Sequence, residues 1–364
     1  MTVDRPRILV APLDWGLGHT TRCIPLISGL LEAGADVWLA GNERQQHVLQ
    51  AEFPKLPFLF LKGYGVRYTK AGHLLAIGLF RQAPRILRRI REEHVWLRQQ
   101  VQQHGFHAII SDNRFGLWHP DIPSIFLTHQ LQLKAPFRAL ARRINYRYIN
   151  RFTECWIPDQ AAPESLAGML SDNRPAPAIP TRYIGWLSRL QPQDSSGGED
   201  QLLISLSGPE PQRTVLEEQL LRDIAHYPGK AVVVRGVPES ARLIPSTGQL
   251  RFYNHLPADA FNKEIARASL VISRSGYSTV MDLAVLQKKS VLVPTPGQSE
   301  QEYLADYLTE KKWACCLSPA KFSLPLALEK AAAFDYAPFP ERRTSCREAI
   351  GELVASIVIP KSRE

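Results

Sequence analysis

The chain has 364 residues, of which 45% are hydrophobic and 22% charged, and its formal net charge at pH 7 is +9. This length favours two domains of roughly 150 to 200 residues each. No run approaches the ~18 consecutive apolar residues of a membrane span, so we expect nothing to cross a bilayer. The start, "MTVDRPRILV", lacks an apolar signal segment and predicts a cytoplasmic location. The five cysteines lack metal-ligand spacing and indicate reduced thiols.

Strand-like apolar runs alternate with helical patterns through the first half of the chain. The runs lie at 7–12, 36–41, 58–61, 107–111, 124–128, 155–158 and 181–186. Such alternation is typical of βα units and of a parallel sheet. The sequence therefore predicts a first Rossmann-like domain over residues 1–189.

A polar stretch rich in Gly, Ser and Pro, "LQPQDSSGGED" at 190–200, is the predicted linker. After it the alternation restarts, which predicts a second Rossmann-like domain over 201–340. Its expected strands lie at 201–207, 230–236, 250–256, 269–274, 290–295 and 313–318. The fold class is thus α/β, with two doubly wound sheets that face a central cleft where ligands bind. A last helical segment within 341–364 can pack back on the first domain.

The positive charge is concentrated between Arg81 and Arg151. Two basic stretches there, 81–98 and 137–151, carry an apolar helical stripe and follow the apolar run "HLLAIGLF" at 73–80. They are either solvated faces of surface helices or a region that dips into a membrane surface rich in anionic lipid. No nucleic-acid-binding signature accompanies the charge, so we do not expect a nucleic acid as partner.

Three polar, glycine-bearing turns each follow a strand and open a helix. They are "LDWGLGHTTR" at 13–22, "SLSGPEPQ" at 205–212 and "SRSGYSTVMDL" at 273–283. Glycine lets the backbone approach a ligand closely, and a helix start offers free N–H groups to an anion. Three such turns around one cleft favour a diphosphate-bearing ligand over three structural turns.

The third turn supplies several groups for such a ligand. Arg274, Ser275 and Gly276 offer a guanidinium, a hydroxyl and free N–H groups to a diphosphate. Ser275, Ser278 and Thr279 are alternatively plain helix caps. Asp282 lies two helical turns after Ser275 and can accept hydrogen bonds from a ribose.

The loop after the next expected strand carries Glu300 and Gln301. Paired acceptors and donors of this kind suit sugar hydroxyls. The alternative is an ordinary first helical turn enriched in acidic residues.

The run from 273 to 305, "SRSGYSTVMDLAVLQKKSVLVPTPGQSEQEYLA", resembles the nucleotide-sugar site of GT-B glycosyltransferases. It is most similar to the bacterial family 28 type, which adds N-acetylglucosamine from its UDP-sugar to a muramoyl-pentapeptide lipid. The resemblance follows the order of elements along most of the chain. Its specific part is the third turn and the loop at Glu300 and Gln301.

The resemblance implies donor-binding roles for six residues. Asp282 takes the place of the ribose-binding carboxylate, Gln301 that of a glutamine that reads the sugar, and Arg274 that of a recurrent arginine. Ser207, followed by Gly208, corresponds to a serine at the diphosphate. Leu256 lies where the family's backbone grips uracil, and Arg189 aligns with an arginine near the hinge.

On the acceptor side, Gly16, Gly18 and His19 resemble a glycine-rich loop with its histidine. Asp112, Phe115 and His129 correspond to residues that line the acceptor pocket. The segment "THQL" at 128–131 replaces the family's His-Glu-Gln-Asn, and Leu304-Ala305 replaces Asn-Ala. These differences predict an acceptor other than the ordinary cell-wall lipid.

The implied reaction is inverting transfer of N-acetylglucosamine or another hexose from a UDP-sugar to an acceptor hydroxyl. His19 is the predicted base, with Asp14 in reserve, and no metal or other cofactor is expected because the sequence has no D-x-D pair. The acceptor is expected to be lipid-linked and held at the inner face of the membrane. Two alternatives remain: a GT-B nucleotide-sugar epimerase, and a non-catalytic nucleotide-sugar or polysaccharide-binding protein.

Overall fold

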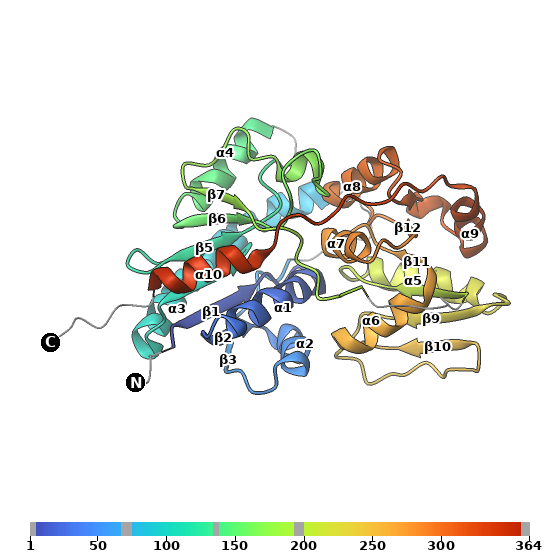
Figure 1. Ribbon diagram of the computed structural model, residues 1–364, viewed down its shortest axis with the longest axis horizontal. Helices are drawn as coiled ribbons and strands as arrows, with labels where there is room; N and C mark the ends of the chain where they lie inside the picture. The colour runs from blue at the N-terminus through green and yellow to red at the C-terminus, as the bar shows by residue number, and fades with distance from the viewer. Residues whose placement is uncertain (1–4, 67–74, 134–137, 193–199, 358–364) are drawn as a thin grey trace.

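The computed structural model describes residues 5–66, 75–133, 138–192 and 200–357. Two α/β domains lie side by side, each built on its own parallel sheet (Figure 1). The start of the predicted membrane-dipping segment, at 73–74, and most of the predicted linker, at 193–199, lie outside the described residues.

The first sheet has seven parallel strands in the order β3-β2-β1-β4-β5-β6-β7. Its inner strands are buried on both faces because helices cover both sides, which explains their continuous apolar runs. The strands are β1 (Arg7–Pro12), β2 (Asp36–Gly41), β3 (Phe58–Phe60), β4 (Ala108–Asp112), β5 (Ser124–Leu127), β6 (Glu154–Ile157) and β7 (Thr181–Tyr183). The helices are α1 (Leu17–Glu32), α2 (Glu43–Glu52), α3 (Leu75–His104) and α4 (Arg138–Ile149).

The second sheet has six parallel strands in the order β10-β9-β8-β11-β12-β13. They are β8 (Gln201–Ser205), β9 (Lys230–Val234), β10 (Leu250–Tyr253), β11 (Ala268–Ser273), β12 (Ser290–Leu292) and β13 (Cys315–Cys316). The helices are α5 (Gln212–Ile224), α6 (Ala258–Arg267), α7 (Tyr277–Val285), α8 (Ser299–Glu310) and α9 (Leu324–Ala333). The predicted α/β class with two doubly wound sheets is confirmed.

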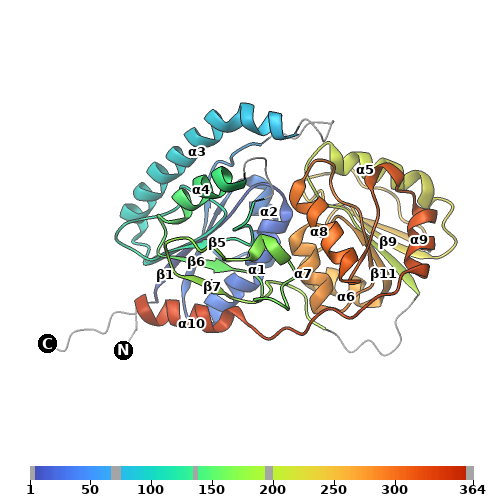
Figure 2. The same cartoon turned by 90° about the horizontal axis from the view of Figure 1, so that it is seen from above.

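The last helix, α10 (Cys346–Ile357), lies against α1 of the first domain (Figures 1 and 2). Gly29 of α1 makes room for it, since a Cβ atom there would lie 2.7 Å from Cδ1 of Ile350. An ion pair of 3.1 Å joins Arg347 to Glu32 at the rim of this contact. The chain therefore passes between the two domains twice, before β8 and again before α10.

Helix α3 runs along the outer side of the first domain (Figure 2). In the parts of the chain described here, no helix combines the length and the hydrophobicity that a bilayer span requires.

Candidate active site between the two domains

Both sheets reverse their strand order beside their first strand. This topology brings the polar residues that follow the central strands together at one edge of each sheet. In the first sheet β1 pairs with β4, with Pro12 opposite Asp112, so the start of α1 lies beside the end of β4. In the second sheet β8 pairs with β11, with Ser205 opposite Ser273. These edges are where ligands bind in doubly wound folds. The domains touch here, because the Ser278 hydroxyl donates to the Gly18 carbonyl oxygen at 2.8 Å.

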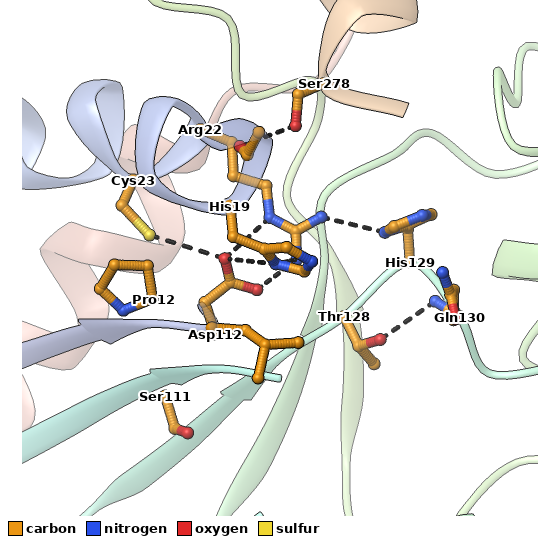
Figure 3. A network of polar contacts seen from close by, with 12 residues as sticks. Pro12, His19, Arg22, Cys23, Ser111, Asp112, Thr128, His129, Gln130 and Ser278 are labelled. Atoms are coloured by element: carbon orange, nitrogen blue, oxygen red, sulfur yellow. Dashed lines mark hydrogen bonds and ion pairs between the residues drawn. The ribbon is translucent and has the colours of Figure 1, made fainter. Parts of the chain in front are cut away.

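His19 and Asp112 form a pair at the edge of the first sheet. Nδ1 of His19 lies 3.1 Å from Oδ2 of Asp112, whose side chain is completely buried (Figure 3). The His19 side chain is 19% exposed, and its Nε2 has no hydrogen-bond partner among the described residues. When a carboxylate accepts a hydrogen bond from the Nδ1 N–H of a neutral histidine, the proton stays on Nδ1 and the Nε2 lone pair is free. The pair can therefore accept a proton from a hydroxyl.

Arg22 completes the buried end of this pair. Its Nε donates to Oδ2 of Asp112 at 2.9 Å, and its Nη2 donates to Oδ1. Burial alone would raise the pKa of Asp112, but Arg22 and His19 hold it well below its usual value. Burial alone would lower the pKa of Arg22, but Asp112 raises it. Both groups are therefore charged in the folded protein.

Glu300 of α8 receives two donors from the first domain. His129 places its Nε2 2.9 Å from Oε1 of Glu300, and the Gln130 side-chain amide donates to Oε2. The His129 ring stacks on Tyr277 of α7, with centroids 4.2 Å apart. Burial would raise the pKa of Glu300, but His129, His19 and Arg22 lower it. A sugar that uses this carboxylate must therefore compete with the first domain.

The end of β8 offers unpartnered hydroxyls beside a glycine. Gly208 has a φ of +109°, a conformation that favours glycine. A Cβ atom on it would lie 3.6 Å from Oγ1 of Thr295, a buried atom without a hydrogen-bond partner. Ser207 is partly exposed, and its hydroxyl has no hydrogen bond within the described chain. This spot can accept an anion through hydroxyls and a closely approaching backbone.

The junction between the domains buries nitrogen atoms that have no hydrogen-bond partner and lie beside a carboxylate. Arg189 is 8% exposed, its Nε and Nη1 lack hydrogen-bond partners, and Glu52 lies 3.7 Å away. Nε2 of His255 also lacks a partner, and burial together with Arg189 lowers the pKa of His255 to about 4. The Ser188 hydroxyl donates to Asp282 at 2.5 Å. Buried polar groups of this kind usually have partners, so the set fits a polar ligand.

Comparison with known protein families identifies the later part of the second domain. Residues 251–350 match the glycosyltransferase family 28 C-terminal domain. This stretch is a family 28 domain. The UDP-N-acetylglucosamine--N-acetylmuramyl-(pentapeptide) pyrophosphoryl-undecaprenol N-acetylglucosamine transferase of Methylobacterium sp. (strain 4-46) is 31% identical over 161 residues. That match spans 40% of this chain and 38% of the relative, which is less than half of either protein.

Solved structures extend the likeness to the whole chain. SnogD from Streptomyces nogalater has a TM-score of 0.60 at 13% identity, over 97% of this chain and 100% of its own. SsfS6 from Streptomyces sp. SF2575, complexed with thymidine diphosphate, has a TM-score of 0.56 at 18% identity, over 97% and 96%. MurG of Acinetobacter baumannii has a TM-score of 0.51 at 13% identity, over 97% and 94%. The predicted GT-B fold is confirmed.

Within the family 28 domain, the role predicted for Arg274 needs correction. Its guanidinium is 2% exposed and donates to the carbonyl oxygens of Val293, Pro294 and Gln212 at 3.3, 3.0 and 2.7 Å. Burial lowers its pKa to about 10. Arg274 therefore holds the loops after β12 and before α5 together, and its hydrogen bonds are directed at the protein backbone rather than at a diphosphate.

The neighbouring predicted residues mostly brace the same loops. Ser275 donates to the Gln301 carbonyl oxygen at 2.8 Å, and Oε1 of Gln301 accepts from the Thr295 N–H at 2.9 Å. The N-cap of α7 is Gly276, without a side-chain cap, so its first N–H groups stay available. The alternative of Ser275 or Ser278 as cap of α7 is thus not what the structure shows. Thr279 is partly buried.

Four other predicted residues fall outside the reacting centre or at its margin. Asp14 accepts hydrogen bonds from the backbone N–H groups of Tyr64 and Gly65, which assigns it to holding that loop and not to base work. Phe115 is partly exposed and packs against Phe126 and Tyr148 in an aromatic cluster, and its place in an acceptor pocket stays a prediction. Leu256 is buried in the core, and only its backbone can meet a base. Gly16, the N-cap of α1 with a φ of +138°, faces open space.

The site also contains residues that were not predicted from the sequence, chiefly Arg22, Thr295 and His255. Arg22 lies three positions after His19 on one helix, a spacing that places both on the same face and was visible in the sequence. Thr295 and His255 stand out only through burial without a partner. Within the described ranges, no three His, Cys, Asp or Glu side chains form a group that could hold a metal ion.

Asp282 should make the protein less stable as the pH rises. Burial raises its pKa from 3.8 to about 6, although Arg189 and Ser188 lower it. Between pH 3.8 and about 6 the folded protein therefore binds more protons than the unfolded chain. The contribution of Asp282 to the free energy of unfolding is fully present below pH 3.8 and is lost as the pH rises through about 6.

We therefore expect Asp282→Asn to be more stable than the parent by about 1 to 3 kcal/mol at pH 8, with the difference gone near pH 4. Urea unfolding at both pH values measures this. The exposed carboxylate of Asp259 serves as control, since Asp259→Asn should change little. Equal stability of Asp282→Asn and the parent at pH 8 would contradict the assignment.

Proposed function

We propose that the protein is an inverting glycosyltransferase that moves N-acetylglucosamine or another hexose from a UDP-sugar to an acceptor hydroxyl. The observation that carries this is the His19–Asp112 pair, which lies where the first domain meets the family 28 domain. The N-acetylglucosamine transferase of Methylobacterium sp. (strain 4-46), to which part of the chain is similar, supports the same donor.

In this mechanism Nε2 of His19 takes the proton from the acceptor hydroxyl while its oxygen attacks the anomeric carbon. The bond from that carbon to the diphosphate breaks on the opposite face, so the configuration inverts. Asp112 accepts a hydrogen bond from the Nδ1 N–H of His19 and stabilises the imidazolium that forms.

The leaving diphosphate gains negative charge and needs fixed donors. The uncapped start of α7, at Gly276, supplies N–H groups and the positive end of the helix dipole. Ser207, Gly208 and Thr295 supply the unpartnered hydroxyls and the close backbone approach. Arg189, His255 and Asp282 are the proposed contacts of the nucleoside.

A cavity of about 430 Å³ between α3 and α4 supports a lipid-linked acceptor at the inner face of a membrane. Its walls combine the apolar Leu87 and Val95, which are 41% and 58% exposed, with Arg91, Arg147 and Arg151. Arg151 lies over the Trp118 ring at 5.7 Å. Apolar and cationic groups side by side suit an anionic amphiphile.

A panel of nucleoside diphosphates and UDP-sugars tests the donor site. A ligand at 100 times its dissociation constant should stabilise the fold by about 2.7 kcal/mol, measured as a shift in Tm. We expect UDP and UDP-N-acetylglucosamine to shift Tm and adenosine diphosphate to have little effect. A panel in which no nucleoside diphosphate shifts Tm would refute the proposal.

Turnover separates the candidate activities. With UDP-N-acetylglucosamine and a polyprenyl-linked sugar acceptor, a transferase releases UDP only when the acceptor is present. An epimerase forms epimerised sugar from the donor alone, and a binding protein turns over neither. We also expect transfer to continue in excess EDTA, because helix N–H groups and hydroxyls serve the diphosphate; its loss, with recovery on added Mg²⁺, would contradict this.

A further inference from the structure

Arg22 is a buried charge that the proposed reaction does not use directly. It lies on α1, three residues after His19, and is 2% exposed. The other inward residues of α1 are mostly apolar, including Ile24, Leu26 and Ile27. A buried guanidinium is costly unless its N–H groups are paired, so its contacts define what it does.

The guanidinium makes a side-on contact with one carboxylate and reaches a histidine beyond it. Nε and Nη2 donate to the two carboxylate oxygens of Asp112, which leaves Nη1 to face Nδ1 of His129 at 3.0 Å (Figure 3). A guanidinium has five N–H donors and no acceptor. Within the described residues Nδ1 of His129 has no partner other than this N–H, so this Nδ1 is the acceptor in the contact.

This contact decides where the proton of His129 lies. With Nδ1 accepting from Arg22, a neutral ring carries its proton on Nε2, which lies 2.9 Å from Oε1 of Glu300. Burial lowers the pKa of His129, as do Arg22 and His19, while Glu300 raises it. Nε2 is thus the donor in the hydrogen bond that crosses from the first domain to α8.

The same guanidinium positions the carboxylate of Asp112, which is the hydrogen-bond partner of His19. Oδ2 of Asp112 accepts from Nε of Arg22 at 2.9 Å and lies 3.1 Å from Nδ1 of His19. Nη2 of Arg22 also lies 2.9 Å from that same Nδ1, but it donates to Oδ1 of Asp112, so Oδ2, which can only accept, takes the Nδ1 N–H of His19. A change at Arg22 therefore displaces the partner of His19 and the bridge to Glu300 together.

We propose that Arg22 is a positioning residue that couples the two domains at the reacting centre. It fixes Asp112 beside His19, and it holds His129 in the tautomer that donates to Glu300. Only the kinetic consequence of this inference rests on the proposed function; the tautomer of His129 does not.

The first test is the tautomer in the unaltered protein. We expect ¹⁵N NMR of histidine-labelled full-length protein at pH 7 to show Nε2 of His129 protonated and Nδ1 bare. His129→Gln identifies the signals by their absence. A proton on Nδ1 of His129 overturns the proposal, whether or not any Arg22 variant folds and whether or not the protein transfers a sugar.

The second test replaces the guanidinium of Arg22 by the single ammonium group of lysine. Arg22→Lys keeps the charge but cannot face Asp112 and His129 at once. We expect a mixture of His129 tautomers and a fall in kcat of about 10 to 100-fold, with the KM for the donor nearly unchanged. Arg44→Lys, which alters another arginine that bridges the domains through the Gly236 carbonyl oxygen, is the control and should change neither.

A folded Arg22→Lys protein with the parent's His129 tautomer and kcat would overturn the proposal. If the tautomer responds as expected but the parent protein transfers no sugar to any acceptor, the proposed function fails and the positioning role stands.

Discussion

Replacing His19 with alanine should lower kcat by about 100 to 10,000-fold, the range that general-base catalysis contributes. The reason is geometric: Nδ1 faces the carboxylate of Asp112, and Nε2 is left without a partner where the domains meet. The affinity for UDP should stay within about threefold, because the proposed diphosphate and nucleoside contacts belong to other residues. Steady-state kinetics and calorimetric titration with UDP measure the two quantities.

His47→Ala is the matched control for His19→Ala. His47 is an exposed histidine of α2 whose Nδ1 lies 2.7 Å from the Glu43 carbonyl oxygen, away from the pair. It should leave both kcat and UDP affinity unchanged. A His19→Ala protein that retains more than about a tenth of the parent's kcat would show that another group removes the proton.

The positions of the strands along the chain could be predicted from the sequence, because burial on both faces leaves a continuous apolar run. The runs at β1, β4 and β5 are short, apolar and bounded by polar turns, which is typical of central parallel strands. Helix α9 was not predicted. Its first turn is set by Ser323, whose hydroxyl accepts from the Leu326 N–H, and its short run "LPLALEKAAA" carries few charges to mark an exposed face.

The candidate site could be predicted only in part, because its pairs join residues far apart in the chain. Asp112 meets His19 across 93 positions, since the sheet places β4 beside β1 and sends β2 and β3 to the other side. A strand order cannot be read from local periodicity, so Asp112 was placed in an acceptor pocket instead. The glycines and the histidine after β1 carried a local signal, and the turn was identified from it.

Arg274 was predicted from its neighbours in the sequence to bind a diphosphate, but its hydrogen bonds are made to the protein backbone. An arginine at the start of a helix beside serines is expected to meet an anion. Here, however, Nη1 and Nη2 donate to three backbone carbonyl oxygens, and Nε is buried without a hydrogen-bond partner. Burial in a loop cluster therefore decides its role, and the proposed contacts of the diphosphate are the α7 start and the hydroxyls of Ser207 and Thr295.

Asp112→Asn should lower the free energy of unfolding by about 3 to 5 kcal/mol, as expected when one partner of a buried ion pair is removed. The substitution keeps the size of the side chain but leaves the Arg22 guanidinium, 2% exposed, without its counter-charge. Because the pKa of Asp112 is lowered in the folded protein, its stabilisation is present above its ordinary value of 3.8 and is lost only as the pH falls further. The deficit of Asp112→Asn should therefore be constant from pH 8 to pH 5.

Urea unfolding of four proteins measures this coupling: the parent, Asp112→Asn, Arg22→Met and the double variant. We expect the double variant to be more stable than the sum of the single losses predicts, because removing both charges leaves neither uncompensated. Asp36→Asn breaks the part-exposed pair with Arg7 and should cost less than about 1 kcal/mol. Additive losses, or a loss for Asp112→Asn no larger than that control, would show that the pair at His19 is not the buried, charged unit on which the proposed base depends.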